Sequence, residues 1–210
     1  MQLLQDRIQA EAKVLPGNIL NVGAFLNQQV DIDLYNEIGK EFARRFSGLP
    51  VTRILTVEAS GIGIACITAQ YFKVPVVFAR KFRAKNISED LYSAEVTSYT
   101  HGIDYTITVP RIYIKPDDAV LLIDDFLANG CALEGLAALT EAAGARLVGA
   151  GVVIEKGFQQ GGKRLREKNI RIESLVIIDS MSPETGISFR QYAQKKTTDY
   201  PHQHPKQHKF

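Results

Sequence analysis

Short runs of Val, Ile and Leu recur along most of the chain, and a segment of helix length follows most of them. These runs contain little polar alternation, which is typical of strands covered on both faces by other elements. The pattern is carried by RILTVE, GIACITAQYF, VPVVFAR, AVLLIDD, CALEGLAALTEAAG, RLVGAGVVIEKG, KRLREKN and IRIESLVIID. We therefore predict an α/β fold with a doubly wound, mainly parallel sheet.

The size and composition are those of one ordinary domain. The chain has 210 residues, of which 45% are hydrophobic and 23% charged, and its formal net charge is +2. Its longest apolar runs, 119–123 and 147–154, fall well short of the roughly 20 residues that a membrane-spanning helix needs. The first segment, MQLLQDRIQAEAK, predicts a short amphipathic helix and no secretory signal. We expect a cytoplasmic protein in which Cys66 and Cys131 are reduced and buried.

Other segments depart from the strand-helix alternation. Asp33 is a candidate N-cap, because apolar residues follow it at helical spacing as far as the break at Gly48. Residues 80–110 contain polar and β-branched runs, which predict a hairpin standing outside the sheet, with a lid at about 81–110. We expect the domain to span residues 1–194 and residues 195–210 to form a flexible polar and basic tail. Three histidines lie in that tail, but we assign no structural metal.

The run AVLLIDDFLANGCA combines an acid pair with a turn of small residues. Asp124 and Asp125 are expected at the carboxyl end of a buried strand, where ligands bind in parallel sheets. The turn after them opens a helix whose free N–H groups can bind a phosphate. Carboxylates accept hydrogen bonds from neutral hydroxyls, so the two halves together suit a ribose 5-phosphate. The alternative is a strand that ends in two solvated acids before an ordinary helix.

The same run, as VLLIDDFLANG, resembles the ribose-phosphate signature of type I phosphoribosyltransferases. The segments ILNVGAFLNQQVD, TVEASGIGIA, VPVVFARK and VVIEKGF are similar to the xanthine phosphoribosyltransferase branch of that family. The resemblance extends from the first helix to about Phe189. It implies transfer of a phosphoribosyl group from phosphoribosyl diphosphate to xanthine in purine salvage, with Mg²⁺ accompanying phosphoribosyl diphosphate. It also implies a homodimer.

The resemblance assigns roles to particular residues of this sequence. Asp124 and Asp125 would be catalytic and hold the ribose hydroxyls. The xanthine contacts would be Leu20, Asn27 and Lys156. The residues that bind phosphoribosyl diphosphate would be Ala128, Asn129, Gly130, Cys131 and Ala132 at the 5-phosphate, and Glu58, Ala59, Ser60 and Gly61 at the diphosphate. Arg80 or Lys81 would help to neutralise the diphosphate, although both also suit a solvated strand end.

The sequence departs from the family pattern within the turn. Many relatives carry Thr where Asn129 and Ala132 stand, so main-chain amides must hold more of the phosphate here, with Asn129 adopting the left-handed turn conformation. Relatives that use hypoxanthine or guanine carry an Asp at the position of Ala128. Its absence leaves no identified proton acceptor for the purine N7.

Two other functions remain open at this point. The fold can serve a regulator that senses a purine or phosphoribosyl diphosphate and binds nucleic acid, or a transferase for another purine base. Balanced charge and the absence of a basic stripe argue against the regulator. The segment GFQQGGKR is close to a nucleotide-binding P-loop but has Arg164 where Ser or Thr would bind magnesium, and GIGIAC lacks the rest of a dinucleotide fingerprint. We therefore interpret GFQQGGKR as a flexible loop between a strand and a helix.

Overall fold

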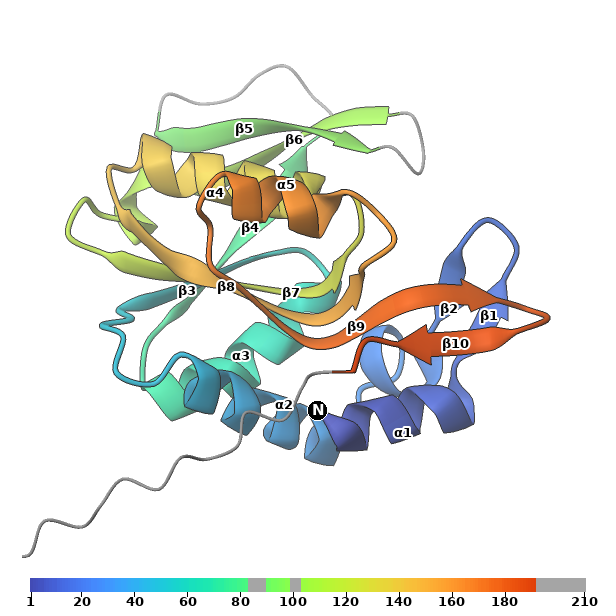
Figure 1. The fold of residues 1–210 in the computed structure, drawn as a ribbon. Coiled ribbons are helices and arrows are strands. Elements are labelled where there is room, and N and C mark those ends of the chain that lie inside the picture. Colours follow the sequence, from blue (N-terminus) through green and yellow to red (C-terminus); the bar gives the residue numbers. More distant parts are fainter. Residues whose placement is uncertain (83–89, 99–102, 192–210) are drawn as a thin grey trace, which may run out of the picture.

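One eight-stranded sheet forms the centre of the molecule in the computed structural model, which describes residues 1–82, 90–98 and 103–191 (Figure 1). The strand order is β10-β9-β8-β7-β3-β4-β6-β5. The strands from β9 to β4 are parallel, and β10, β6 and β5 are antiparallel additions at the two edges. The bounds are β3 (Arg53–Val57), β4 (Val76–Phe82), β5 (Leu91–Ser98), β6 (Ile103–Pro110), β7 (Ala119–Leu127), β8 (Arg146–Lys156), β9 (Ile172–Ser182) and β10 (Gly186–Phe189). The predicted fold class is confirmed.

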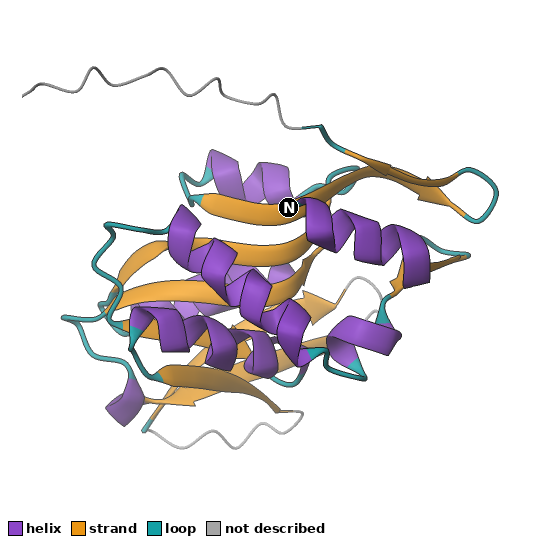
Figure 2. Cartoon of the chain, turned by 90° about the horizontal axis from the view of Figure 1, so that it is seen from below, coloured by secondary structure: helices purple, strands orange, loops and turns teal. Residues whose placement is uncertain are grey.

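Helices cover both faces of the sheet, as Figures 1 and 2 show. On one face lie α1, α2 and α3, and on the other α4 and α5. The bounds are α1 (Gln2–Glu11), α2 (Ile32–Arg45), α3 (Ser60–Phe72), α4 (Cys131–Ala142) and α5 (Gly161–Glu167). A small hairpin, β1 (Lys13–Leu15) and β2 (Ile19–Asn21), and a π-helical turn, η1 (Gly23–Asn27), follow α1, and a 3₁₀ turn, η2 (Arg111–Tyr113), precedes β7.

Strand β7 shows why its sequence is apolar without alternation. Leu121 and Ile123 pack into the core under α1, α2 and α3. Val120 and Leu122 pack into the core under α4. Neighbouring side chains in a strand point to opposite faces, so a strand with helices on both sides needs apolar residues at every position.

The hairpin predicted to stand outside the sheet is instead part of it. Arg80 to Phe82 of β4 pair antiparallel with β6, and β6 pairs with β5 along its length. Val96, Ile107 and Val109 are buried in the core under α4, so the hairpin continues the sheet and wraps over that helix (Figure 1). Burial of the hairpin's apolar face against α4 stabilises its position in the sheet. Residues 83–89 and 99–102 of the expected lid lie outside the described residues.

Two local expectations at the amino-terminal half were wrong in detail. Asp31, not Asp33, caps α2, because its Oδ1 accepts a hydrogen bond from the N–H of Leu34 at 3.1 Å. Asp33 instead lies in the first turn, where a negative charge also suits the helix dipole. Both cysteines are free, but Cys66 is exposed and Cys131 half-buried, so the expectation of buried thiols fails.

The carboxyl-terminal region contains more structure than its composition indicated. Beyond Ser182 the chain turns back and forms β10 against β9. The expected end of the domain and the tail of residues 195–210 lie outside the described residues. Among the residues that the structure describes, no helix is long and apolar enough to cross a membrane.

Candidate active site

The acid pair lies within β7 rather than after it. Asp124 and Asp125 are 4% and 7% exposed, and the strand continues through Phe126 to Leu127. Each acid accepts a hydrogen bond from the next backbone N–H, Asp124 from Asp125 at 3.0 Å and Asp125 from Phe126 at 2.9 Å. Burial raises the pKa of Asp124 well above its ordinary value, and the neighbouring carboxylate of Asp125 adds to this effect. Ionised Asp124 is therefore costly in this site, and a cation or a hydroxyl donor beside it would reduce that cost.

The side chains of Asp124 and Asp125 interact with each other, which adds to the raised pKa of Asp124, but the two acids have different neighbours. A Cβ added to Gly61 would come within 3.4 Å of Asp124 Oδ1, and the charge of Lys81 acts to lower the pKa of Asp124. Asn27 donates a hydrogen bond from Nδ2 to Asp125 Oδ2 at 3.4 Å. One acid thus adjoins the expected diphosphate residues and the other the expected purine residues.

Residues 128–132 form the turn between β7 and α4. Gly130 is the N-cap of α4 and has a left-handed φ of +83°. This corrects the expectation for Asn129, because the residue without a Cβ adopts the conformation that disfavours side chains. No side chain caps the helix, so its first N–H groups remain available to a ligand. The turn has the geometry of an anion site built from main-chain amides.

Residues 58–61 join β3 to α3 beside this turn. The peptide bond between Glu58 and Ala59 is cis, and α3 begins at Ser60. Glu58 Oε1 accepts a hydrogen bond from the N–H of Lys81 at 2.6 Å, which ties the segment to β4. A Cβ on Gly61 would lie 2.1 Å from Thr56 Oγ1, so only glycine allows this close approach.

Arg80 and Lys81 do not point the same way. Lys81 Nζ lies 5.5 Å from the ring of Tyr105, on the side of Asp124. Arg80 lies over the ring of Phe78 at 5.8 Å and lines a cavity on the other side of β4. Within one chain the structure therefore brings Lys81, and not Arg80, to the acid pair.

The three residues expected to contact xanthine come from three elements. Leu20 of β2 is 7% exposed, Asn27 ends η1, and Lys156 ends β8. Lys156 Nζ donates to the carbonyl oxygen of Asn18 at 2.8 Å and lies 5.6 Å from the ring of Phe126. Burial lowers the pKa of Lys156 from its usual value. Lys156 and Asn27 thus flank β7 at the point where the acid pair and Phe126 lie.

The match to a known family follows from this geometry and from the sequence together. Residues 33–183 match the model of the phosphoribosyl transferase domain. The chain belongs to the phosphoribosyltransferase family. The xanthine phosphoribosyltransferase of Lachnoclostridium phytofermentans is 56% identical over 186 residues, which cover 89% of this chain and 96% of that protein. The xanthine phosphoribosyltransferase of Alkaliphilus metalliredigens is 57% identical over 185 residues, which cover 88% and 92%. The resemblance indicated by the sequence motifs is confirmed.

Solved structures agree on the phosphoribosyltransferase fold. The adenine phosphoribosyltransferase of Giardia lamblia, complexed with 9-deazaadenine, has a TM-score of 0.71 at 24% identity and covers 83% of this chain and 97% of its own. The Trypanosoma brucei adenine phosphoribosyltransferase, in complex with AMP, pyrophosphate and ribose-5-phosphate, has a TM-score of 0.68 at 24% identity and covers 83% and 79%. At this level of identity the likeness supports the fold alone.

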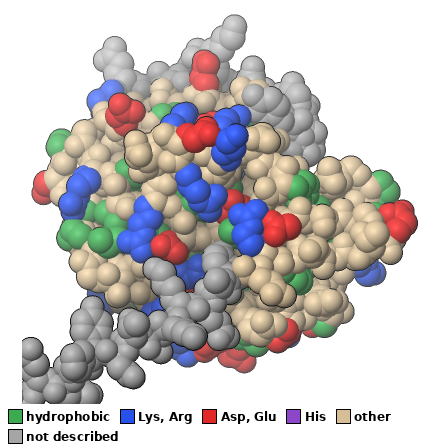
Figure 3. Space-filling view, viewed as in Figure 1, with side chains coloured by type: hydrophobic (Ala, Val, Ile, Leu, Met, Phe, Trp, Pro, Cys, Tyr) green, Lys and Arg blue, Asp and Glu red, His purple; other side chains and the backbone are tan. Residues whose placement is uncertain are grey.

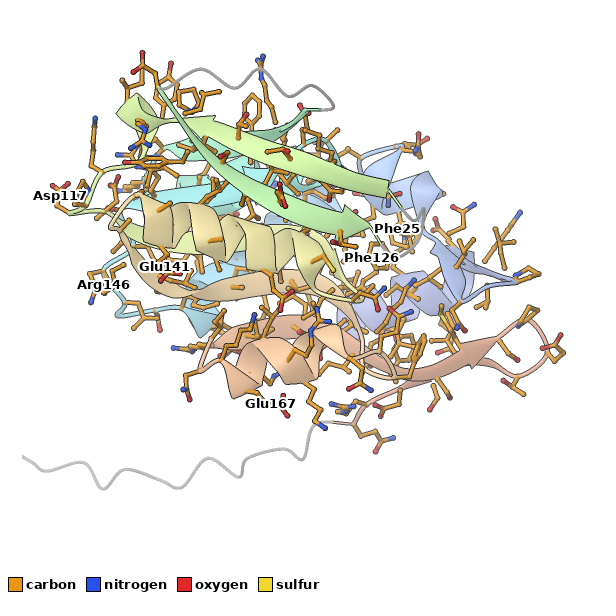
Figure 4. The ribbon with its side chains drawn as sticks, turned by 90° about the horizontal axis from the view of Figure 1, so that it is seen from above. Phe25, Asp117, Phe126, Glu141, Arg146 and Glu167 are labelled. Carbon is orange, nitrogen blue, oxygen red and sulfur yellow. The ribbon has the colours of Figure 1, made fainter. Side chains whose placement is uncertain are left out.

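Sequence reasoning missed two aromatic residues of this phosphoribosyltransferase. Phe126 is half-buried between the acid pair and the turn, and Figure 4 shows it next to the amino-terminal segment, whose apolar cluster it packs against. Its place between Asp125 and the turn was a usable signal, because side chains at that end of the strand line the site. Tyr35 of α2 is buried and donates a hydrogen bond from its hydroxyl to the carbonyl oxygen of Leu26. Only the packing of α2 under η1 reveals this second contact.

The surface argues against the regulator that the sequence left open. On the face that carries α5, Lys and Arg side chains are interspersed with Asp and Glu (Figure 3). Ion pairs join Arg164 and Lys168 to Glu134, and Arg190 to Asp179. Cations that are already paired with acids have little charge left to bind the phosphates of a nucleic acid.

Proposed function

We propose that the chain transfers the 5-phosphoribosyl group from phosphoribosyl diphosphate to xanthine, giving xanthosine 5′-monophosphate and diphosphate in purine salvage. The observation that carries the proposal is the arrangement around β7. The small-residue turn follows the acid pair, Asn27 is bonded to Asp125, and Lys156 lies over the ring of Phe126. The identity of 56–57% to proteins named xanthine phosphoribosyltransferase supports this choice of purine.

The ribose half of the substrate suits the turn and the acid pair. The N–H groups at the start of α4 would hold the 5-phosphate, and the buried carboxylates would accept hydrogen bonds from the ribose hydroxyls. Breaking the bond from the anomeric carbon to diphosphate develops positive charge on the ribose, which negative charge nearby stabilises. A ligand that donates to Asp124 therefore also removes part of the penalty of its buried charge.

The diphosphate half suits residues 58–61, with Lys81 and Mg²⁺ as its cations. The acid pair is a donor set that fits Mg²⁺, which takes one or two carboxylates, keeps several waters and completes its shell with substrate phosphates. Among the described residues there is no group of three or more acid, His or Cys side chains that would hold a metal by itself. We therefore infer that Mg²⁺ enters with phosphoribosyl diphosphate, where it supplies positive charge for the leaving group.

The purine half suits Lys156, Asn27 and Leu20. Xanthine carries exocyclic oxygens that a lysine can donate to, whereas adenine carries none. Asn27 can donate and accept along the purine edge, and Leu20 and the ring of Phe126 offer apolar surface to its faces. The partly buried Lys156 would exchange its bond to the carbonyl of Asn18 for one to the purine.

We also propose that the protein is a cytoplasmic homodimer. Phe78, Ile112 and Tyr113 are large apolar residues that are 38%, 66% and 50% exposed, and Phe78 and Tyr113 line a cavity of about 680 Å³ that Arg80 also lines. Exposed apolar surface of this kind suits an interface between proteins. A second copy packed there would bury it, and sedimentation tests the assembly.

A purine panel tests the proposed reaction. The protein is incubated with phosphoribosyl diphosphate, Mg²⁺ and xanthine, guanine, hypoxanthine or adenine, and diphosphate release is measured. Xanthine is expected to react fastest, and a faster reaction with another base would refute the choice of purine. Omitting Mg²⁺ is expected to abolish turnover.

A variant at Lys156 tests the purine site. Lys156→Gln is expected to raise the KM for xanthine by roughly ten- to hundredfold, because a hydrogen bond to a charged group contributes about 1.5–3 kcal/mol and each 1.4 kcal/mol is a factor of ten. The KM for phosphoribosyl diphosphate should change less than about twofold on the same scale. Lys163→Gln, at an exposed lysine of α5, is the matched control. Equal losses for both substrates would contradict the role of Lys156.

A further inference from the structure

The side chains of the turn, residues 128–132, hold its backbone only weakly, through a 4.0 Å hydrogen bond from Cys131 Sγ to the carbonyl oxygen of Asn129. The side chains of the turn are Ala, Asn, Cys and Ala around Gly130, and α4 has no side-chain cap. A site made of main-chain N–H groups works only if the peptide planes are held in the right orientation before the ligand arrives. Something outside the turn must supply that constraint.

The beginning of α5 lies directly against the turn. The N–H of Gly161 donates to the carbonyl oxygen of Ala128 at 3.1 Å. A Cβ on Gly161 would lie 2.4 Å from that oxygen and 2.6 Å from the N of Gly130, so the two backbones touch with no room for a side chain. Gly161 belongs to the segment GFQQGGKR (residues 157–164), which has no nucleotide to bind in the proposed reaction. The prediction that this segment is a flexible loop was wrong for its last four residues, which begin α5.

Arg164 makes the second contact. Its Nη2 donates to the carbonyl oxygen of Asn129 at 2.7 Å and also lies 3.0 Å from Glu134 Oε2 in the first turn of α4. Arg164, which stands where a P-loop would have Ser or Thr, thus joins the turn to α4. Its neighbour Lys163 points elsewhere, toward Glu167 at 3.9 Å.

These two contacts determine where the amides of the turn point. In a planar trans peptide the C=O and the following N–H point in opposite directions. Holding the oxygen of Ala128 aims the N–H of Asn129 away from α5, and holding the oxygen of Asn129 does the same for the N–H of Gly130. Both amides are then directed to the side of the turn where a phosphate can bind.

We propose that Gly161 and Arg164 are positioning residues for the 5-phosphate, acting through the backbone of residues 128–130. The inference rests on the proposed function only in the identity of the ligand. Because the same segment begins one residue after Lys156, it also links the end of β8 that faces the purine to the turn that faces the phosphate.

The test separates the two phosphate-binding halves of the site. Dissociation constants for ribose 5-phosphate and for diphosphate are measured by calorimetry on the wild type, Arg164→Met and Lys163→Met. Arg164→Met keeps the length of the side chain but has no donors, and it is expected to weaken ribose 5-phosphate about tenfold, the effect of one lost charge-assisted hydrogen bond. Diphosphate binding should change less than about twofold, because the hydrogen bonds of Arg164 to Asn129 and Glu134 lie at the turn expected to hold the 5-phosphate. Lys163→Met should match the wild type for both ligands.

Steady-state kinetics and a second variant complete the test. The KM for phosphoribosyl diphosphate should rise in Arg164→Met while that for xanthine stays unchanged, and Arg164→Lys should restore part of the loss. If Arg164→Met does not fold, the comparison is made with Arg164→Lys, which is expected to weaken ribose 5-phosphate by a smaller factor. Equal weakening of both ligands, or none, would overturn the inference. Failure of the proposed function would appear separately, as a wild type that binds ribose 5-phosphate but does not use xanthine.

Discussion

The hydroxyl of Tyr35 gives a direct test of how the purine side of the site is held. Tyr35 is 1% exposed, and its hydroxyl donates to the carbonyl oxygen of Leu26, one residue before Asn27. Asn27 in turn contacts Asp125. The change Tyr35→Phe removes one oxygen atom, leaves the ring in place and releases the backbone that carries Asn27.

The expected magnitude follows from the burial of this hydrogen bond. A hydrogen bond contributes about 0.5–1.5 kcal/mol net, and an unsatisfied buried acceptor raises the loss to about 1–3 kcal/mol. We expect Tyr35→Phe to lower the free energy of unfolding by about 1–2 kcal/mol, which lowers Tm by roughly 2–8 °C in a chain of this size. If the released backbone must be ordered again when xanthine binds, the KM for xanthine rises by about five- to thirtyfold.

The assay compares two Tyr→Phe variants by thermal unfolding and by KM for each substrate. Tyr71→Phe is the matched control, because Tyr71 is 39% exposed and its hydroxyl makes only a 3.4 Å contact with Asn36. Burial raises the pKa of Tyr35 to about 12, with a smaller contribution from Asp125, so the hydroxyl remains a donor and the effect should not vary between about pH 6 and 9. A rise in the KM for phosphoribosyl diphosphate equal to that for xanthine, or the same loss in Tyr71→Phe, would refute the reasoning.

Three further changes test the acid pair, the turn and the buried ion pair of β8. Burial and Asp125 raise the pKa of Asp124, so the stability that this group contributes is present at acid pH and is lost as the pH rises through its folded-state pKa. Asp124→Asn should therefore abolish most activity yet raise Tm relative to the wild type, by more at pH 8 than at pH 4; a variant less stable than the wild type at pH 8 contradicts this. Gly130→Val should reduce kcat/KM for phosphoribosyl diphosphate by roughly tenfold or more, because a β-branched residue at φ +83° carries about 1–3 kcal/mol of strain. An unchanged KM for phosphoribosyl diphosphate would mean that the phosphate binds elsewhere. Burial alone would raise the pKa of Glu155, but hydrogen bonds from Arg166 and Ser174 hold that pKa below its usual value. The stability that ionised Glu155 contributes is therefore present above its unfolded-state pKa and is lost as the pH falls through its folded-state pKa. Glu155→Gln should lower Tm at pH 7 and much less at pH 3, and an equal fall at both would show that charge is not involved.

The sequence contains most of what determines the sheet. Strands that are buried on both faces need apolar residues at successive positions. β7 and β8 have such residues because α3 and α4 cover opposite faces of the sheet. The turn of small residues between β7 and α4 was also predictable, because it separates a buried apolar run from a segment of helical composition. Its role in phosphate binding stays a prediction. These features depend on local composition, which a single sequence displays.

Features that depend on what lies across the fold were not predictable in this way. The alternating residues of β5 and β6 indicated a hairpin, but only the position of α4 shows that its apolar face is buried and that it therefore extends the sheet. Arg80 and Lys81 look equivalent in sequence, yet strand alternation sends Arg80 over Phe78 and Lys81 toward Tyr105. Asn129 was assigned the left-handed conformation, and the glycine beside it takes that conformation at lower strain.

The continuation of β7 through the acid pair has the largest consequence for function. Had the strand ended at Ile123, the acids would lie in a flexible turn, where both carboxylates could face solvent on the same side. Because the strand continues to Leu127, the two acids are held in contact with each other, with Asp124 beside Gly61 and Asp125 bonded to Asn27. The ribose binds between diphosphate and purine in the proposed reaction, so an acid pair with one neighbour from each half can contact the ribose while one rigid strand fixes its distance to both. A single residue inserted between Asp124 and Asp125 would turn the following residues of β7 to the other face and separate Asp125 from Asn27, so we expect it to abolish transfer even if each substrate still bound.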